Sequence, residues 1–377
     1  MADSRILVLD VTTDAVAGIA LLESKQGVEI LSAHFCRLSE SLSFSEALAE
    51  ILEHCNTSPD RCLVSVGPEQ LYYRLLNIPF NDLKKVRSVV PFEIEDSVSF
   101  QDEPYLFDYL LQPSVEEGTD VFTVIAREQL IQQMLDELSE HGLDPEVVTV
   151  SGLPSVWNGI RQQGGSRTSF ALLHIDWTVT SIYIIIDNEI KTIRSIHSHL
   201  KDEENAEDQL VEEITQGKIS ERSEQMLKGL AGDIRYSLVA LESMLPEGVD
   251  IPMVFEGAAG RIQQARDFLL TELSGSIWEG YSQEYIQLEN YETLAEHPER
   301  GCFDAVLALA CCKPKDRGRI NFRRDDFAFG GQNGKYAQIV KYAAGVLVLA
   351  FMATVSYQTV EYNKMKRQRA ELADQIE

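Results

Sequence analysis

The sequence predicts a two-lobed α/β domain that is followed by a single membrane-spanning helix. A run of three short strands joined by tight turns opens the chain, and the same pattern returns after residue 165. Helices alternate with further strands in both halves, which is typical of an α/β architecture. Residues 342–360 contain no charged side chain and have about the length that a helix needs to cross a bilayer.

The first lobe is predicted over residues 1–165. Alternation of apolar residues predicts its strands, and apolar residues at helical spacing predict its helices. The opening elements are predicted as strands 5–11, 15–24 and 29–38, a helix over 43–55 and a buried strand over 61–67. Ser43 is expected to cap the helix, with Glu46 completing a capping box.

Residues 71–150 are predicted to form a module that is inserted in this lobe or appended to it. Its expected strands are 71–79, 104–112, 120–127 and 145–152, and its expected helices are 81–98 and 127–142. Pro91 lies inside the first of these helices, so a kink or a break is expected there. A helix over 152–163 follows, and the Gly-Gly-Ser stretch at 164–166 predicts the boundary between the lobes.

The second lobe is predicted over residues 166–315. It opens with expected strands at 169–177, 180–188 and 189–199, and it continues with helices at 202–215 and 219–244, a strand at 251–257, and helices at 261–273 and 302–312. The first strand of each lobe ends at an aspartate, Asp10 in one and Asp176 in the other. This correspondence predicts a loose internal duplication.

Charge and cysteine content narrow the classes of function. The net charge of −27 argues against a nucleic-acid partner and suits a protein partner with basic or mixed patches. The six cysteines show neither disulfide-framework nor metal-ligand spacing, so they are expected to be reduced core thiols. His197 and His199 lack a third ligand nearby in the sequence, His54 has no recognisable ligand spacing with Cys55 and Cys62, and no metal site is predicted.

The apolar stretch 342–360 is interpreted as a membrane span. Tyr342 and Tyr357 lie near its ends, where aromatic rings favour the membrane interface, and Leu347 and Phe351 lie inside it. A buried core helix is the alternative, but dense charge on both flanks disfavours it. Basic residues are more numerous before the span, and the first residues lack the features of a signal peptide. We therefore expect a cytoplasmic N-terminal domain, a basic juxtamembrane linker over 316–341, and the start of an outer helix over 361–377.

Two lobes that each open with three strands and an aspartate resemble the actin-like ATPase fold, which is ribonuclease H-like. The stretch VFEGAAGRI (254–262) stands where that fold has its third ligand-binding turn. Residues 74–98 look like a segment of PilM-type pilus proteins and of protein L of the type II secretion system. The stretch RINFRRDDFAF (319–329), followed by the predicted span, is similar to protein L, so the chain is identified as a member of that family, the GspL family.

The resemblance places a nucleotide site at three turns, and the sequence departs from the family's active pattern in all of them. The positions concerned are Asp10, Thr12, Thr13, Asp176, Thr178 and Gly257. Thr12 replaces the glycine of the first turn, Trp177 follows Asp176 in the second, and alanines follow Gly257 in the third. Glycine lets backbone N–H groups approach a phosphate closely, so its loss predicts a degenerate site that binds no cofactor and performs no catalysis.

The resemblance implies a non-catalytic adaptor of the bacterial inner membrane that crosses it once. In this role the cytoplasmic domain recruits the secretion ATPase, protein E, through that enzyme's N-terminal domain. The other expected partners are the platform proteins M and F, with C as a further candidate, and the outer helix could pair in a homodimer. Two alternatives remain open: an active actin-like ATPase, and a type IV pilus assembly protein with PilM-like and PilN-like parts in one chain.

Overall fold

The computed structural model divides the chain into two compact units, Met1–Phe327 and Ala328–Glu377. It describes residues 3–25, 27–39, 41–55, 58–97, 103–114, 118–162, 168–198, 200, 220–239, 251–278, 281, 288–295, 300–330, 352, 354, 357–361 and 364–366. The predicted acidic helix over 202–215 lies outside these residues.

A five-stranded sheet forms the centre of the first lobe, in the order β3-β2-β1-β4-β8. Its strands are β1 Ser4–Val11, β2 Ala15–Glu23, β3 Val28–Arg37, β4 Arg61–Val66 and β8 Val147–Val150. The first three pair antiparallel, whereas β4 runs parallel to β1 and to β8. Helix α1, Phe44–Cys55, packs its apolar face on this sheet, and the predicted capping box is confirmed because Glu46 accepts hydrogen bonds from the N–H and hydroxyl of Ser43.

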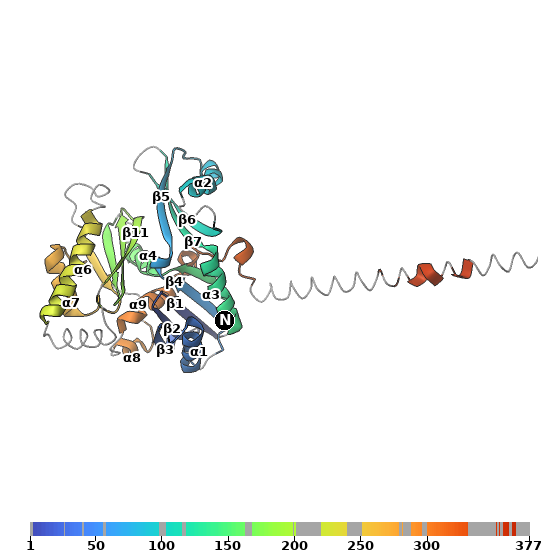
Figure 1. The fold of residues 1–377 in the computed structure, drawn as a ribbon, viewed down its shortest axis with the longest axis horizontal. Helices are drawn as coiled ribbons and strands as arrows, with labels where there is room; N and C mark the ends of the chain where they lie inside the picture. The colour runs from blue at the N-terminus through green and yellow to red at the C-terminus, as the bar shows by residue number, and fades with distance from the viewer. Residues whose placement is uncertain are drawn as a thin grey trace, which may run out of the picture. The chain divides into compact units, whose positions relative to one another are not determined.

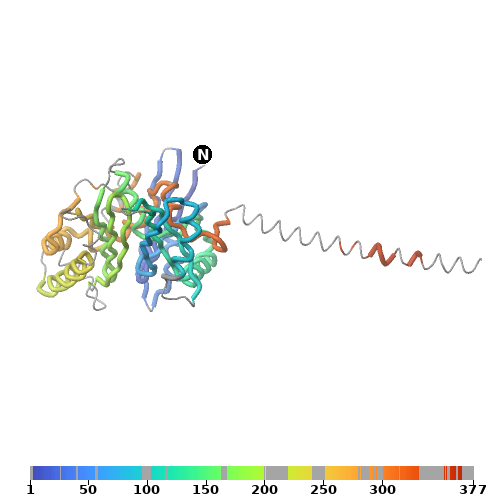
Figure 2. Tube along the Cα trace, turned by 90° about the horizontal axis from the view of Figure 1, so that it is seen from above, coloured from blue at the N-terminus to red at the C-terminus, as the bar shows by residue number. Residues whose placement is uncertain are grey.

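The second lobe repeats this arrangement with four strands in the order β11-β10-β9-β12. Its strands are β9 Phe170–Ile175, β10 Val179–Ile186, β11 Glu189–His197 and β12 Met253–Glu256. Again three strands pair antiparallel and the fourth lies parallel to the first of them. Helices α6, Glu221–Val239, and α7, Gln263–Leu273, cover the side of this sheet that faces away from the first lobe (Figures 1 and 2). The shared strand order confirms the predicted duplication.

The module has its own three-stranded sheet in the order β5-β7-β6. These strands are β5 Tyr72–Ile78, β6 Tyr105–Pro113 and β7 Thr119–Arg127. Helix α3, Glu128–Glu140, then returns the chain to β8, which pairs with β4. The last strand of the predicted range 71–150 therefore belongs to the five-stranded sheet.

Helix α2, Leu83–Ser97, continues through Pro91 without a break. Val86 and Val90 before the proline and Ile94 after it are all buried against the module's sheet. This packing on both sides of Pro91 outweighs the backbone hydrogen bond that the proline cannot make, so the break that its position suggested does not occur.

Helices α4, Leu153–Gln162, and α9, Asp304–Cys311, complete the core of the first unit. All six cysteines are free thiols, four of them buried and two half-buried, as expected from their spacing. Residues 316–327, which were assigned to a juxtamembrane linker, belong instead to the folded unit.

This segment is held on the first lobe by its apolar side chains and by its arginines. Ile320 and Phe322 are buried in the core, and the Phe322 N–H donates to the carbonyl oxygen of Val148 over 2.9 Å. Arg324 pairs with the buried Asp108 over 2.7 Å, and Arg323 pairs with Asp144 over 2.7 Å. Much of the positive charge expected for a linker is therefore used within the domain.

Within the second unit, the structure describes helical residues at 352, 354, 357–361 and 364–366. Tyr357 is among them and is exposed, whereas Tyr342, Leu347 and Phe351 lie outside the described residues. In the part of the chain that the structure describes, no helix combines the length and the apolar character needed to cross a membrane. The span over 342–360 therefore stays a prediction.

Candidate functional site

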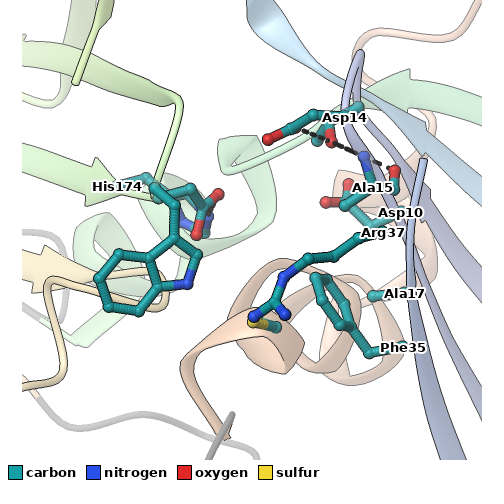
Figure 3. Close-up of a pocket in the computed structure, with 11 residues that line it drawn as sticks. Asp10, Asp14, Ala15, Ala17, Phe35, Arg37 and His174 are labelled. Carbon is teal, nitrogen blue, oxygen red and sulfur yellow. Dashed lines mark hydrogen bonds and ion pairs between the residues drawn. The ribbon is translucent and has the colours of Figure 1, made fainter. Parts of the chain in front are cut away.

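A pocket between the two lobes brings together Asp10, Thr12 and Asp176, three of the six positions that the resemblance singled out. It holds about 520 Å³ of empty space, including the part that opens to solvent. Its lining residues are Asp10, Thr12, Asp14, Ala15, Ala17, Phe35, Arg37, His174, Asp176, Trp177 and Cys302. Figure 3 shows His174 on one side of the pocket, facing Asp10, Asp14 and Arg37 of the first lobe.

The first turn joins β1 to β2, and its backbone donors are taken up by the protein. The Thr12 N–H donates to the Ala15 carbonyl oxygen over 3.0 Å, and the Ala15 N–H donates to the Thr12 hydroxyl over 3.1 Å. The Thr13 N–H donates to Oε1 of Glu69 over 2.9 Å. Thr12 thus closes its own turn with its side chain, and these N–H groups are not presented to a ligand.

The second turn joins β9 to β10 and is hydrogen-bonded directly to the first. The Thr178 hydroxyl donates to the Asp14 carboxylate, whose other oxygen accepts from the Thr12 hydroxyl over 3.0 Å. Trp177, only 7% exposed, lines the pocket and packs in the core cluster of the second lobe. The two turns that would clamp a phosphate in an actin-like ATPase are therefore bonded to each other.

The third turn follows β12, and its backbone donors are used in the same way. Four successive N–H groups donate to protein acceptors: Gly257 to Asp304 Oδ2 (3.0 Å), Ala258 to Asp176 Oδ1 (2.9 Å), and Ala259 and Gly260 to the Ile175 carbonyl oxygen (3.0 and 3.2 Å). Gly257 has a φ of 86°, and a Cβ there would lie 2.6 Å from the Ile175 carbonyl oxygen. Packing alone explains why this position is glycine.

A buried charge network lies behind the second and third turns. His174 Nε2 is 3.1 Å from Asp176 Oδ2, and its Nδ1 is 4.0 Å from Glu256 Oε2, within ion-pair range but beyond a hydrogen bond. Burial alone lowers the pKa of His174, but the two carboxylates outweigh it and hold this pKa well above its usual range. Burial raises the pKa of Asp176 and of Glu256, but His174 together with the Ala258 N–H for Asp176, and with Arg261 and Ser155 for Glu256, outweighs it, so both pKa values are lowered.

These contacts leave Asp10 and Asp176 poorly suited to a hydrated Mg²⁺. Burial raises the pKa of Asp10, against the hydrogen bond that its Oδ1 accepts from Ser65 Oγ over 2.5 Å. The raised pKa makes the charged form, which a cation needs, less favourable for Asp10 than for an exposed aspartate. Both carboxylate oxygens of Asp176 already accept hydrogen bonds, one from Ala258 and one from His174.

Three neighbours of the candidate site, His174, Asp14 and Glu69, were not predicted from the sequence. His174 lies in β9 and Asp176 directly follows that strand, so the two-residue period of a strand could have placed both on one face. Asp14 directly follows Thr12 and Thr13 in the first turn, so its place in that turn was a local signal. Glu69 had no local signal, because it is 56 residues from Thr13 in sequence and is brought there by the short helix η1, Pro68–Gln70.

The pKa of Glu69 predicts a pH dependence of stability. Burial raises this pKa to about 7 from a usual value near 4.5, so the folded chain holds a proton that the unfolded chain releases. Stability from this group therefore falls as pH rises from about 4.5 to about 7. We expect Glu69→Gln, which keeps the oxygen that accepts from Thr13, to be more stable than wild type at pH 8 by about 1–3 kcal/mol.

Denaturant unfolding at pH 5 and pH 8 measures this difference. The gap should be small at pH 5, and the exposed-site control Glu53→Gln should show no gap at either pH. A pH profile of Glu69→Gln that runs parallel to that of wild type would contradict the assignment.

Comparison of the chain with known proteins identifies its fold. No protein-family model and no curated protein matches the sequence. Among solved structures, the chain is similar to the PilM-PilN type IV pilus biogenesis complex, with a TM-score of 0.61, 16% identity, and coverage of 82% of this chain and 99% of that one. The fold is actin-like. The similarity and the repeated strand order together confirm this prediction.

Two further solved structures are similar to the chain. One is the cytoplasmic domain of EpsL, an inner-membrane component of the type II secretion system of Vibrio cholerae, with a TM-score of 0.41, 14% identity, and coverage of 74% of this chain and 98% of that one. The other is the ethanolamine utilization protein EutJ from Carboxydothermus hydrogenoformans, with a TM-score of 0.44, 8% identity, and coverage of 83% and 90%.

Proposed function

We propose that this chain is a non-catalytic adaptor of a type II secretion system. Its actin-like unit recruits the cytoplasmic secretion ATPase, protein E, and the span predicted over 342–360 holds the complex at the inner membrane. There the adaptor meets the platform proteins M and F, and C is a further candidate. Holding the ATPase at the membrane raises its effective concentration beside these partners without any new contact.

The observation that carries this proposal is the hydrogen bond from the Thr178 hydroxyl to the Asp14 carboxylate. In an actin-like ATPase the corresponding turns are separated by the phosphates of the nucleotide. Here a side-chain pair from the two lobes occupies that interval, and the carboxylate adds negative charge where an anionic phosphate would lie. This arrangement supports a cleft in which the two turns hold the lobes together and do not clamp a phosphate.

The module offers a surface for a protein partner. Phe92 projects from helix α2 and is 68% exposed, on the side opposite the buried Val90. Glu93 and Glu95 beside it are also exposed. An exposed aromatic ring among carboxylates suits an interface in which a partner supplies an apolar pocket with a basic rim.

A co-purification experiment tests the adaptor role. The full chain should retain the N-terminal domain of the secretion ATPase, and Phe92→Glu should weaken this binding at least about tenfold if the ring is a central contact. Tyr236→Glu, at an aromatic residue of α6 that is 74% exposed, is the matched control and should bind as wild type does. If Phe92→Glu bound the ATPase domain as tightly as wild type, the contact would lie outside α2. Absence of binding by wild type would contradict the adaptor role.

Nucleotide titration tests the non-catalytic part of the proposal. Titration of the full chain with ATP and Mg²⁺ should give no saturable heat at millimolar nucleotide, and phosphate release should equal the buffer rate. The reason is that the backbone donors of the first and third turns already have protein acceptors, and the Thr178 hydroxyl of the second turn donates to Asp14. ATP binding that Asp10→Ala abolishes would instead support an active actin-like ATPase.

A second candidate is a type IV pilus assembly protein that combines PilM-like and PilN-like parts. The solved structure with a TM-score of 0.61 is described as a pilus biogenesis complex, and this favours the candidate. Affinity purification from cells separates the two roles, since a secretion adaptor retains a secretion ATPase and a pilus platform protein retains a pilus ATPase.

A further inference from the structure

Two histidines and a glutamate lie together on the first lobe, outside the pocket between the lobes. His34 belongs to β3, which is the edge strand of the five-stranded sheet, and Glu50 and His54 lie one turn apart on α1. Residues four apart share one face of a helix, so both side chains of α1 can reach the strand beneath. None of the three lines the interlobe pocket.

Their ligand atoms are close enough to serve one ion. One nitrogen of each histidine and one carboxylate oxygen of Glu50 all lie within 4.8 Å of one another. His34 Nε2 is 3.0 Å from Glu50 Oε1, and the two imidazole rings are stacked with centroids 3.8 Å apart. Among the residues that the structure describes, these three form the one group of three or more His, Cys, Asp or Glu side chains that could hold a metal ion.

The hydrogen bond of His54 defines its tautomer. His54 Nδ1 lies 2.9 Å from the carbonyl oxygen of Glu50, and a carbonyl can only accept, so Nδ1 carries the proton. The lone pair of His54 is therefore on Nε2. Metal-binding histidines commonly donate their other N–H to a backbone carbonyl in this way, which orients the ring.

We infer that His34, Glu50 and His54 form a zinc-binding site. Two imidazole nitrogens and one carboxylate oxygen suit Zn²⁺, whereas Mg²⁺ and Ca²⁺ prefer oxygen ligands alone. Zinc bonds of about 2.0–2.2 Å place tetrahedral ligands about 3.3 Å apart, close to the 3.0 Å that separates His34 Nε2 from Glu50 Oε1. His34 binds through Nε2 in the tautomer with its proton on Nδ1, and His54 completes the three protein ligands through Nε2, the nitrogen that carries its lone pair.

The site joins an edge strand to the helix that covers it and leaves a fourth position for water. Because zinc binds the folded chain, occupancy raises the stability of the first lobe by mass action. Cys36 lies two residues after His34 on the same face of β3, but its thiol is buried near the Ala47 carbonyl oxygen, 3.7 Å away, and it is not one of the three ligands.

Zinc titration of the full chain tests this inference. The protein is stripped with a chelator, and Zn²⁺ alone is titrated in competition with a chromophoric chelator. Wild type should bind one zinc ion per chain, with a higher melting temperature when loaded. Glu50→Gln and His54→Ala should each weaken the affinity at least about tenfold and abolish this rise, because each removes a direct ligand.

Glu53→Gln, at an exposed position of α1 outside the group, is the matched control and should bind as wild type does. Circular dichroism of the stripped variants establishes that they remain folded, which is expected because Glu50→Gln preserves shape and His54 is exposed. The inference is overturned if stripped wild type binds no zinc, or if zinc binding persists unchanged in both ligand variants.

Discussion

Phe322→Ala is expected to lower the free energy of unfolding of the unit Met1–Phe327 by about 3–5 kcal/mol. Phe322 is 2% exposed and belongs to the core cluster of the first lobe, so the shorter side chain leaves a cavity there. The same change loosens the segment 319–324 from β8, where the Phe322 N–H and the Asn321 side chain bond to Val148. Urea unfolding measures the loss of stability, and limited trypsin digestion measures the release of the segment through cleavage after Arg323 and Arg324.

Phe92→Ala is the control for this prediction. It makes the same change at a ring that is 68% exposed and should alter stability by no more than about 0.5 kcal/mol. If Phe322→Ala were as stable as this control and as resistant to trypsin as wild type, the segment 319–324 would not be part of the folded unit.

His174→Ala is expected to destabilise the same unit by about 3–5 kcal/mol at pH 7. The change leaves the buried carboxylates of Asp176 and Glu256 without the imidazolium between them, and an uncompensated buried charge is costly. The folded-state pKa of His174 is raised, so its stabilising contribution is complete below the ordinary value near 6.5 and is lost as pH rises through the raised value. The gap between wild type and variant should therefore narrow at alkaline pH.

Thermal unfolding from pH 6 to pH 10 measures the difference in stability between wild type and His174→Ala. His197→Ala is the control at an exposed histidine. The control should track wild type throughout. A His174→Ala variant with wild-type stability at pH 7 would mean that Asp176 and Glu256 are satisfied by other groups.

The strands and helices of both lobes could be predicted because their signals are local. Asp10 lies one residue before the end of β1, and apolar residues recur every three or four positions in α1; both features depend on neighbours in the sequence. The order of these elements was enough to indicate an actin-like fold. Pro91 shows the limit of local reasoning, since its effect on α2 depended on how Val86, Val90 and Ile94 pack against the module's sheet.

The candidate site could be predicted only in part. The replacement of glycine by Thr12 indicated a degenerate turn, but not that the turn's donors would be satisfied by Glu69 and by Thr12 itself. The hydrogen bond between Thr178 and Asp14 joins residues 164 positions apart, and the segment 319–324 reaches β8 across a similar interval. Contacts between residues so far apart produce no periodic pattern in the sequence, so they could not be predicted from it.

The sequence by itself determined the two-lobed α/β architecture, the acidic charge, and the loss of glycine from the first two turns. These properties depend only on the residue types and on their spacing along the chain. Only the tertiary structure decided that the two turns bond to each other, that residues 316–327 fold onto the first lobe, and that His34 meets Glu50 and His54. The physical reason is that side-chain contacts depend on how the sheets and helices pack, which brings together residues that the chain keeps far apart.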